Sequence, residues 1–245
     1  MKKLIINADD FGMCEGVTRG IIQCHREGVL TSTTLMTNMP YAAKALEMAE
    51  QYPNLGVGIH LVLTCGRPLT LGKKSFTDEN GDFKKLNTYP DKKAIVDPNE
   101  LYEEWHAQME LFIQLAGKKP THIDSHHHTH LEQGNIEVAT RLAKEYDLPM
   151  RLEKDIQHHY EFAPLIRGFN GEIKDFIQFC EEHLNKEGIQ EMMCHPGFID
   201  DHLYNNSSYA IPRIYEMKFI RSPEFKQWLH DHDIELINFR DIKKR

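Results

Sequence analysis

The sequence predicts an α/β fold in which mostly parallel strands alternate with helices. Two observations favour this class: short apolar runs rich in β-branched residues recur along the chain, and segments with helical spacing lie between them. A length of 245 residues with 40% hydrophobic residues suits a single α/β domain, residues 1–245. The number of strand–helix units fits either a doubly wound sheet or an incomplete barrel.

The predicted strands are short apolar runs of the usual strand length. They are Leu4–Asn7, Leu30–Thr37, Gly56–Leu63, His122–Ser125, Pro149–Leu152, Met192–His195 and Ile234–Asn238. Since helices separate them, we expect right-handed crossovers and a mostly parallel sheet. In both candidate architectures a ligand binds at the carboxyl ends of the strands.

The predicted helices carry apolar stripes. One stripe starts at Val17, a second runs from Leu101 to Phe112, and a third runs from Ile173 to Leu184. Two helix starts have favourable chemistry, because Asp97-Pro98 and Ser222-Pro223 each place a capping side chain before a proline at the first helical position.

The charge balance argues against a polyanion as the main partner. The formal net charge is −8, so no basic surplus exists to neutralise the phosphates of a nucleic acid. The five cysteines form no CxxC pair, and reduced thiols in a cytoplasmic protein are the simplest interpretation. The apolar run after Met1 is too short for a signal peptide, and no segment is long enough to span a membrane.

Polar residues stand where several predicted strands end. Asp9 and Asp10 follow the first strand, His60 lies in the third, His126 follows the fourth and His195 ends the sixth. In a parallel sheet these groups meet at one rim, and carboxylates with imidazoles form the usual set for a mononuclear metal site with an acid and a base.

Each of these residues also has a structural interpretation. The aspartate pair could cap a helix, His60 could be a core histidine among apolar neighbours, and the His195-Pro-Gly segment could be a plain turn. The segment from His126 to His130 could be a solvated loop. If it is extended instead, alternation places Asp124, His126 and His128 on one side of the chain.

Four segments together resemble the YdjC-like carbohydrate deacetylases, the family of the chitooligosaccharide deacetylases. The segments are Asn7-Ala8-Asp9-Asp10-Phe11-Gly12, Gly58 to Thr64, Thr121 to His130 and His195-Pro196-Gly197. The resemblance implies a distorted, incomplete (β/α) barrel like that of polysaccharide deacetylases. It also implies a divalent metal ion and removal of acetyl from chitooligosaccharides such as diacetylchitobiose.

Matched position by position, the resemblance makes His60 and His126 metal ligands. By analogy with polysaccharide deacetylases, Asp10 is the third ligand, Asp9 the catalytic base and His195 the catalytic acid. The roles of the two aspartates could be reversed, and the role of His128 is left open. The family is usually described with Mg²⁺, whereas two imidazoles and one carboxylate suit Zn²⁺, Co²⁺ or Mn²⁺ at least as well.

The partner expected from this resemblance is a small acetylated sugar, and a homodimer stays open as the oligomeric state. Two segments, Gly66–Val96 and Glu153–Gly171, are too long for ordinary connections, and we expect them to shape the sugar cleft. Tyr89, Tyr160 and Phe162 are the aromatic side chains that could stack on a sugar there.

Two other functions compete with deacetylation. A metal-dependent phosphoesterase also uses Asp and His at strand ends, but it needs a cation for phosphate, and only Arg67 and Arg151 lie near predicted strand ends. A non-catalytic metal or sugar binder would not need the second carboxylate of the Asp9–Asp10 pair.

Overall fold

The strands of the computed structural model form one sheet at the centre of the molecule. The structure describes residues 1–152, 154–155, 160–162 and 171–242. The strands are β1 (Lys2–Phe11), β2 (Ser32–Leu35), β3 (Gly56–Leu61), β4 (Ile123–Ser125), β5 (Lys154–Asp155), β6 (Tyr160–Phe162), β7 (Gly188–Cys194) and β8 (Ile234–Leu236). Their order is β4-β3-β2-β1-β7-β6-β5, with β8 paired to the start of β1. All pairs are parallel except β5 with β6.

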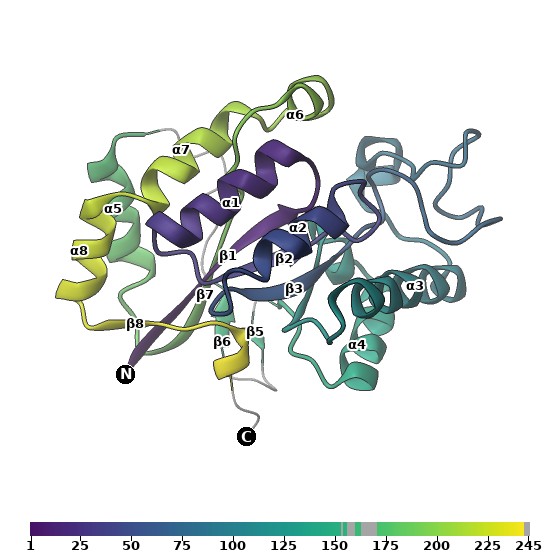
Figure 1. The fold of residues 1–245 in the computed structure, drawn as a ribbon. Helices are drawn as coiled ribbons and strands as arrows, with labels where there is room; N and C mark the ends of the chain where they lie inside the picture. Colours follow the sequence, from purple (N-terminus) through teal and green to yellow (C-terminus); the bar gives the residue numbers. More distant parts are fainter. Residues whose placement is uncertain (153, 156–159, 163–170, 243–245) are drawn as a thin grey trace.

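Helices surround this sheet, which confirms the expected α/β class (Figure 1). They are α1 (Glu15–Glu27), α2 (Ala42–Ala49), α3 (Pro98–Ala116), α4 (Asn135–Tyr146), α5 (Ile173–His183), α6 (Asp201–Asn206), α7 (Ile211–Ile220) and α8 (Pro223–Asp231). In Figure 1, α3 and α4 lie side by side on one side of the molecule, near β3, whereas α5 and α8 lie together on the opposite side.

One segment of the chain contacts both ends of the sheet. The carbonyl of Pro149 and the amide of Arg151 bond to the backbone of Ile123 in β4, and β5 begins three residues after Arg151 and pairs with β6. The open edge of β4 is therefore linked along the chain to the opposite end of the sheet. This arrangement is that of an incomplete barrel rather than of a flat doubly wound sheet.

Both predicted helix caps are confirmed. The Asp97 side chain accepts hydrogen bonds from the amides of Asn99 and Glu100 at the start of α3. Ser222 accepts one from the amide of Phe225 at the start of α8. These side chains satisfy amides that a helix leaves without partners, so the local sequence sets where both helices begin.

Two sequence expectations about strands were wrong. Residues Pro149–Leu152 form only an isolated bridge, between Met150 and Ile123, instead of a strand. The chain after β4 is not extended, because His126–Leu131 form a 3₁₀ helix in which His127 and His128 have φ of 59° and 55°. The alternation expected for Asp124, His126 and His128 therefore does not occur.

No helix in the described ranges is long and apolar enough to cross a membrane. The five cysteines all lie within these ranges and carry free thiols. Four of them are buried, and Cys65 is half-buried.

Candidate metal centre at the strand ends

The carboxyl end of β1 contains an irregularity that redirects Asp10. The register of β1 with β2 shifts between Ala8 and Phe11, and Asp10 has φ of 69°, a left-handed conformation that is uncommon for a residue other than glycine. In a regular strand Asp9 and Asp10 would point to opposite faces. With the bulge, Asp10 contacts His126, which follows β4, and Asp9 contacts Arg151; both aspartates are almost fully buried.

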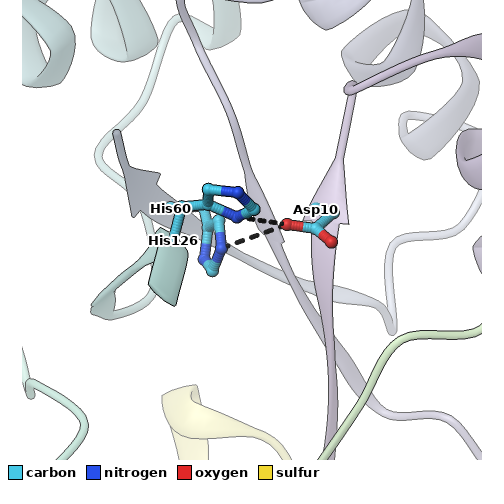
Figure 2. Close-up of side chains that lie close together, drawn as sticks. All are labelled: Asp10, His60 and His126. Atoms are coloured by element: carbon cyan, nitrogen blue, oxygen red, sulfur yellow. Dashed lines mark hydrogen bonds and ion pairs between the residues drawn. The ribbon is translucent and has the colours of Figure 1, made fainter. Parts of the chain in front are cut away.

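Asp10, His60 and His126 come together at this end of the sheet (Figure 2). Oδ1 of Asp10 lies 3.3 Å from Nε2 of His60 and 2.9 Å from Nδ1 of His126. Figure 2 shows both rings on the same side of the carboxylate, converging on one oxygen. The three side chains arise from β1, from β3 and from the residue directly after β4.

The donor set and its spacing fit a divalent metal ion. A metal bound at about 2.0–2.2 Å places neighbouring ligand atoms roughly 3 Å apart, which matches the separations around Oδ1 of Asp10. Two imidazole nitrogens and one carboxylate oxygen are the protein ligands of many catalytic sites that leave a position open for water. Asp10, His60 and His126 could therefore hold such an ion.

Asp124 and Thr34, from the two strands next to β3, fix the orientation of the His60 ring. Its Nδ1 lies 2.7 Å from Oδ1 of Asp124, and Oγ1 of Thr34 donates to Oδ2 of Asp124 at 3.0 Å. Burial alone lowers the pKa of His60, but the carboxylates of Asp124, Asp9 and Asp10 outweigh this effect and raise it to about 10. The negative field that holds a proton on His60 also favours a bound cation.

Asp9 lies beside this cluster but has a different partner. Arg151 pairs with both of its oxygens, at 2.8 Å each, and Asn7 donates to Oδ1 at 3.1 Å. Burial raises the pKa of Asp9, but the Arg151 guanidinium outweighs burial and holds this pKa far below its usual range. The carboxylate is thus ionised at neutral pH.

Arg151 is fully buried and joins three strands. Besides Asp9 of β1 it contacts Asp124 of β4 at 2.9 Å and Glu191 of β7 at 2.7 Å. The guanidinium fork suits several carboxylates at once, which a lysine could not match. The sequence marked Arg151 only as a cation near a strand end; its partners lie 27 to 142 residues away along the chain, so no local pattern indicates them.

His195 follows β7 at the same end of the sheet. Its Nδ1 lies 4.0 Å from Oε2 of Glu216, and its ring packs edge-on against Tyr209 at 5.4 Å. Burial lowers the pKa of His195 to about 3, although the carboxylates of Asp10 and Asp9 act in the opposite direction. His195 is therefore neutral at rest.

Two charged residues of α7 were missed by the sequence interpretation. Arg213 donates from Nη2 to Oδ2 of Asp10 at 2.5 Å, and Glu216 accepts a hydrogen bond from the backbone amide of His195. Both are buried. A signal was present, because two charges three residues apart occur in a helix whose intervening residues are largely apolar.

Of the aromatic residues proposed to stack on a sugar, Tyr89 does not fit. Its side chain is only 9% exposed, and burial raises its pKa to about 12. The side chains of Tyr160 and Phe162, and most of the segment Glu153–Gly171, lie outside the described residues.

The cations considered for phosphate binding are engaged with carboxylates. Arg151 is buried among Asp9, Asp124 and Glu191, and Arg67 pairs with Asp82 on the surface at 3.0 Å. Neither presents a guanidinium to a phosphate at the Asp10 cluster, and Arg213, which does lie there, is paired with Oδ2 of Asp10.

Comparison with known proteins gives a consistent set of similarities. The family model described as YdjC-like protein matches residues 3–231. The chain is 39% identical to a carbohydrate deacetylase of Clostridium beijerinckii, covering 98% of this chain and 100% of that one. It is also 39% identical to a chitooligosaccharide deacetylase of Yersinia pestis, covering 98% and 99%.

The fold of this chain also resembles the folds of solved structures. A protein from Enterococcus faecalis, described as a candidate cellobiose-phosphate cleavage protein, has a TM-score of 0.88 and 35% identity, covering 98% of both chains. A family 4 carbohydrate esterase from Streptomyces lividans, in complex with acetate, has a TM-score of 0.54 and 10% identity, covering 100% of this chain and 97% of that one. At that identity the second similarity concerns the fold alone, which is the polysaccharide-deacetylase-like barrel.

Proposed function

This chain belongs to the YdjC-like protein family, and we propose that it is a metal-dependent hydrolase that removes the acetyl group from an N-acetylated sugar. The observation that carries the proposal is the meeting of Asp10, His60 and His126 at the strand ends. The names of the relatives support a carbohydrate amide as substrate, and we propose a chitooligosaccharide such as diacetylchitobiose. The family match across residues 3–231 supports one deacetylase domain over 1–245.

The proposed reaction needs help at two atoms, because an amide carbonyl is a poor electrophile and an amine is a poor leaving group. A divalent ion held by Asp10, His60 and His126 would polarise the acetyl carbonyl and lower the pKa of a bound water. The protein's own residues must then accept the proton of the water and deliver a proton to the nitrogen.

Asp9 is the proposed base. Its carboxylate is ionised, and Arg151 and Asn7 fix its orientation, so it can accept a proton without rearranging. The same ion pair makes Asp9 a weak base. It can therefore accept a proton only from a water whose pKa a metal ion has lowered. Arg151 also keeps three neighbouring carboxylates together, since their mutual repulsion would otherwise oppose folding.

His195 is the proposed acid. Burial keeps it neutral, so it must take up a proton before it can protonate the leaving nitrogen. The nearby carboxylates Asp9 and Asp10 stabilise the charged imidazolium once it forms. Glu216 accepts a hydrogen bond from the backbone amide of His195, and its Oε2 lies 4.0 Å from Nδ1 of the ring.

The proposed ion is divalent: Mg²⁺, as the family resemblance implies, or Zn²⁺, Co²⁺ or Mn²⁺, which suit the ligand set at least as well. Mg²⁺ prefers oxygen ligands and retains its waters, whereas this cluster offers two ring nitrogens among its three ligand atoms. Metal analysis of the purified protein, followed by activity measurements with each ion, tests this choice.

The experiment that tests the proposed activity offers the metal-loaded protein three substrates. They are diacetylchitobiose, cellobiose phosphate and a generic phosphate ester, with acetate, free disaccharide or glucose, and phosphate as the measured products. We expect acetate and a free amine from the first and no turnover of the others. Cleavage of either phosphorylated compound without acetate release from diacetylchitobiose would contradict the proposal.

A further inference from the structure

The first part of helix α7, residues 211–216, has an inverted distribution of side chains, whereas the apolar residues Met217, Phe219 and Ile220 further along the helix are buried. Its charged residues Arg213 and Glu216 are 2% and 0% exposed, whereas its apolar residues Ile211 and Ile214 are 64% and 48% exposed. A helix at a protein surface normally buries its apolar face and exposes its charges. Departures from that pattern are expected where a site requires them. We therefore expect the buried charges of α7 to contact polar residues at the carboxyl ends of the strands.

Arg213 is held in place by groups on several sides. Its Nη2 donates to Oδ2 of Asp10 at 2.5 Å, and its Nε donates to the carbonyl of Tyr209 at 3.0 Å. Its side-chain stem packs at Gly197, where an added Cβ would lie 3.3 Å from Cδ of Arg213 and 3.2 Å from Cα of Val17. The glycine of the His195-Pro-Gly segment thus leaves room for this arginine.

The two oxygens of Asp10 have separate partners. Oδ2 contacts Arg213, while Oδ1 faces His60 and His126. The left-handed backbone of Asp10 fixes the Cα position, but rotation of the carboxylate about the Cβ–Cγ bond is free unless an oxygen is anchored. Arg213 supplies that anchor with a charged donor whose geometry suits a carboxylate.

We propose that Arg213 is a positioning residue that anchors Oδ2 of Asp10 so that only Oδ1 is offered to a metal ion. The inference rests on the proposed metal site. Groups that orient a metal ligand from behind affect metal affinity or activity by about 10–100-fold. The positive charge of Arg213 repels a bound cation, but its ion pair with Asp10 largely neutralises that charge. When Arg213 is replaced, the lost orientation of Asp10 should therefore lower metal affinity more than the lost repulsion between Arg213 and the cation raises it.

The test compares Arg213→Met and Arg213→Lys with wild type and with Arg221→Met. Arg221 is the C-cap residue directly after the same helix and pairs with Glu27 at 2.7 Å, away from the Asp10 cluster, so it is a matched control. The dissociation constant for Zn²⁺ is measured by competition with a chromophoric chelator. In parallel, kcat and KM are measured from acetate release from diacetylchitobiose at saturating Zn²⁺.

We expect Arg213→Met to bind Zn²⁺ about 10–100-fold more weakly than wild type, with a lower kcat and a nearly unchanged KM. Arg213→Lys should recover part of the affinity, since an ammonium group can still contact Oδ2. Arg221→Met should match wild type. If the circular dichroism spectrum shows that Arg213→Met is not folded, Arg213→Lys replaces it as the test variant. Its Zn²⁺ affinity should then lie between that of wild type and that of Asp10→Asn.

Three results would overturn the inference: unchanged Zn²⁺ affinity in both Arg213 variants, tighter binding in Arg213→Met, or a raised KM with unchanged Zn²⁺ affinity. The last would make Arg213 a substrate contact. Asp10→Asn separates this inference from the proposed function. If Asp10→Asn binds Zn²⁺ as wild type does, the metal site itself is wrong; if it loses Zn²⁺ while Arg213→Met does not, only the role of Arg213 fails.

Discussion

Oδ1 of Asp124 lies 2.7 Å from Nδ1 of His60, and this contact decides which nitrogen of the ring faces Asp10. Because Nδ1 donates its hydrogen to the carboxylate, Nε2 is the nitrogen that can bind a cation, 3.3 Å from Oδ1 of Asp10. Asp124 is buried in β4, next to β3, so the pairing of two strands sets the chemistry of the ring.

Replacing Asp124 by Asn should weaken metal binding. An amide accepts the Nδ1 hydrogen less strongly than a carboxylate, so we expect Zn²⁺ affinity to fall by about 10–100-fold, with a parallel loss of acetate release. Glu191→Gln is the matched control, because Glu191 also contacts Arg151 but does not contact His60. Equal losses in the two variants would mean that Asp124 acts through Arg151 instead of through His60.

Replacing Asp9 by Asn should abolish turnover while the metal content stays nearly unchanged. Loss of a general base reduces kcat by about 10²–10⁴-fold, and the oxygen of the introduced amide could still accept a hydrogen bond from Arg151. Acetate release and metal content of the same preparation are the two measurements. Loss of metal instead of turnover would show that the roles of Asp9 and Asp10 are reversed.

Glu216 should make the stability of the fold depend on pH. Burial raises its pKa from 4.5 to about 7, so the folded protein binds a proton that the unfolded chain releases between these values. The contribution of Glu216 to stability is therefore fully present below pH 4.5 and lost as pH rises through about 7. A shift of this size corresponds to roughly 3 kcal/mol.

The variant Glu216→Gln tests this dependence, because Gln keeps the shape of the side chain without a titrating carboxyl. Its free energy of unfolding minus that of wild type should increase by roughly 3 kcal/mol between about pH 4.5 and pH 7.5, as measured by urea denaturation. A difference that stays constant over this range would contradict the assignment.

Replacing Ser222 by Ala should destabilise the fold without changing the chemistry. Its hydroxyl caps α8 by accepting from the amide of Phe225, and loss of such a cap lowers the free energy of unfolding by about 1 kcal/mol. For a chain of this size the melting temperature should fall by about 2–4 °C. Ser222→Thr keeps the hydroxyl and should restore most of the loss, while kcat stays at the wild-type value in both variants.

The parts of the fold that depend on local sequence were predictable. Apolar periodicity located β1, β3 and β7, and capping chemistry at Asp97 and Ser222 marked two helix starts. The short strands β5 and β6 were missed because two or three residues carry no detectable period. The prediction of an extended chain after β4 was wrong because His127 and His128 adopt left-handed conformations.

The candidate site, like the fold, has one part that could be predicted from the sequence and one part that could not. The rule that parallel strands end at one rim brought Asp10, His60 and His126 into a single hypothesis, and the structure places them together. The partners that orient them could not be predicted, since Arg213 lies 203 residues from Asp10 and Asp124 lies 64 residues from His60. Ion pairs of this kind depend on tertiary packing, so the local pattern in α7 indicates two unusually placed charges but not the residues with which they pair.

Metal removal and replacement is the most direct test of metal-dependent deacetylation at this rim. Acetate release from diacetylchitobiose is measured for wild type, His60→Ala and His126→Ala, first after treatment with a chelator and again after one equivalent of Zn²⁺, Co²⁺ or Mn²⁺ is added. We predict no acetate from the stripped wild type, recovery with at least one ion, and no recovery in either histidine variant. Acetate release by the stripped protein at the rate of the metal-loaded protein would contradict the account.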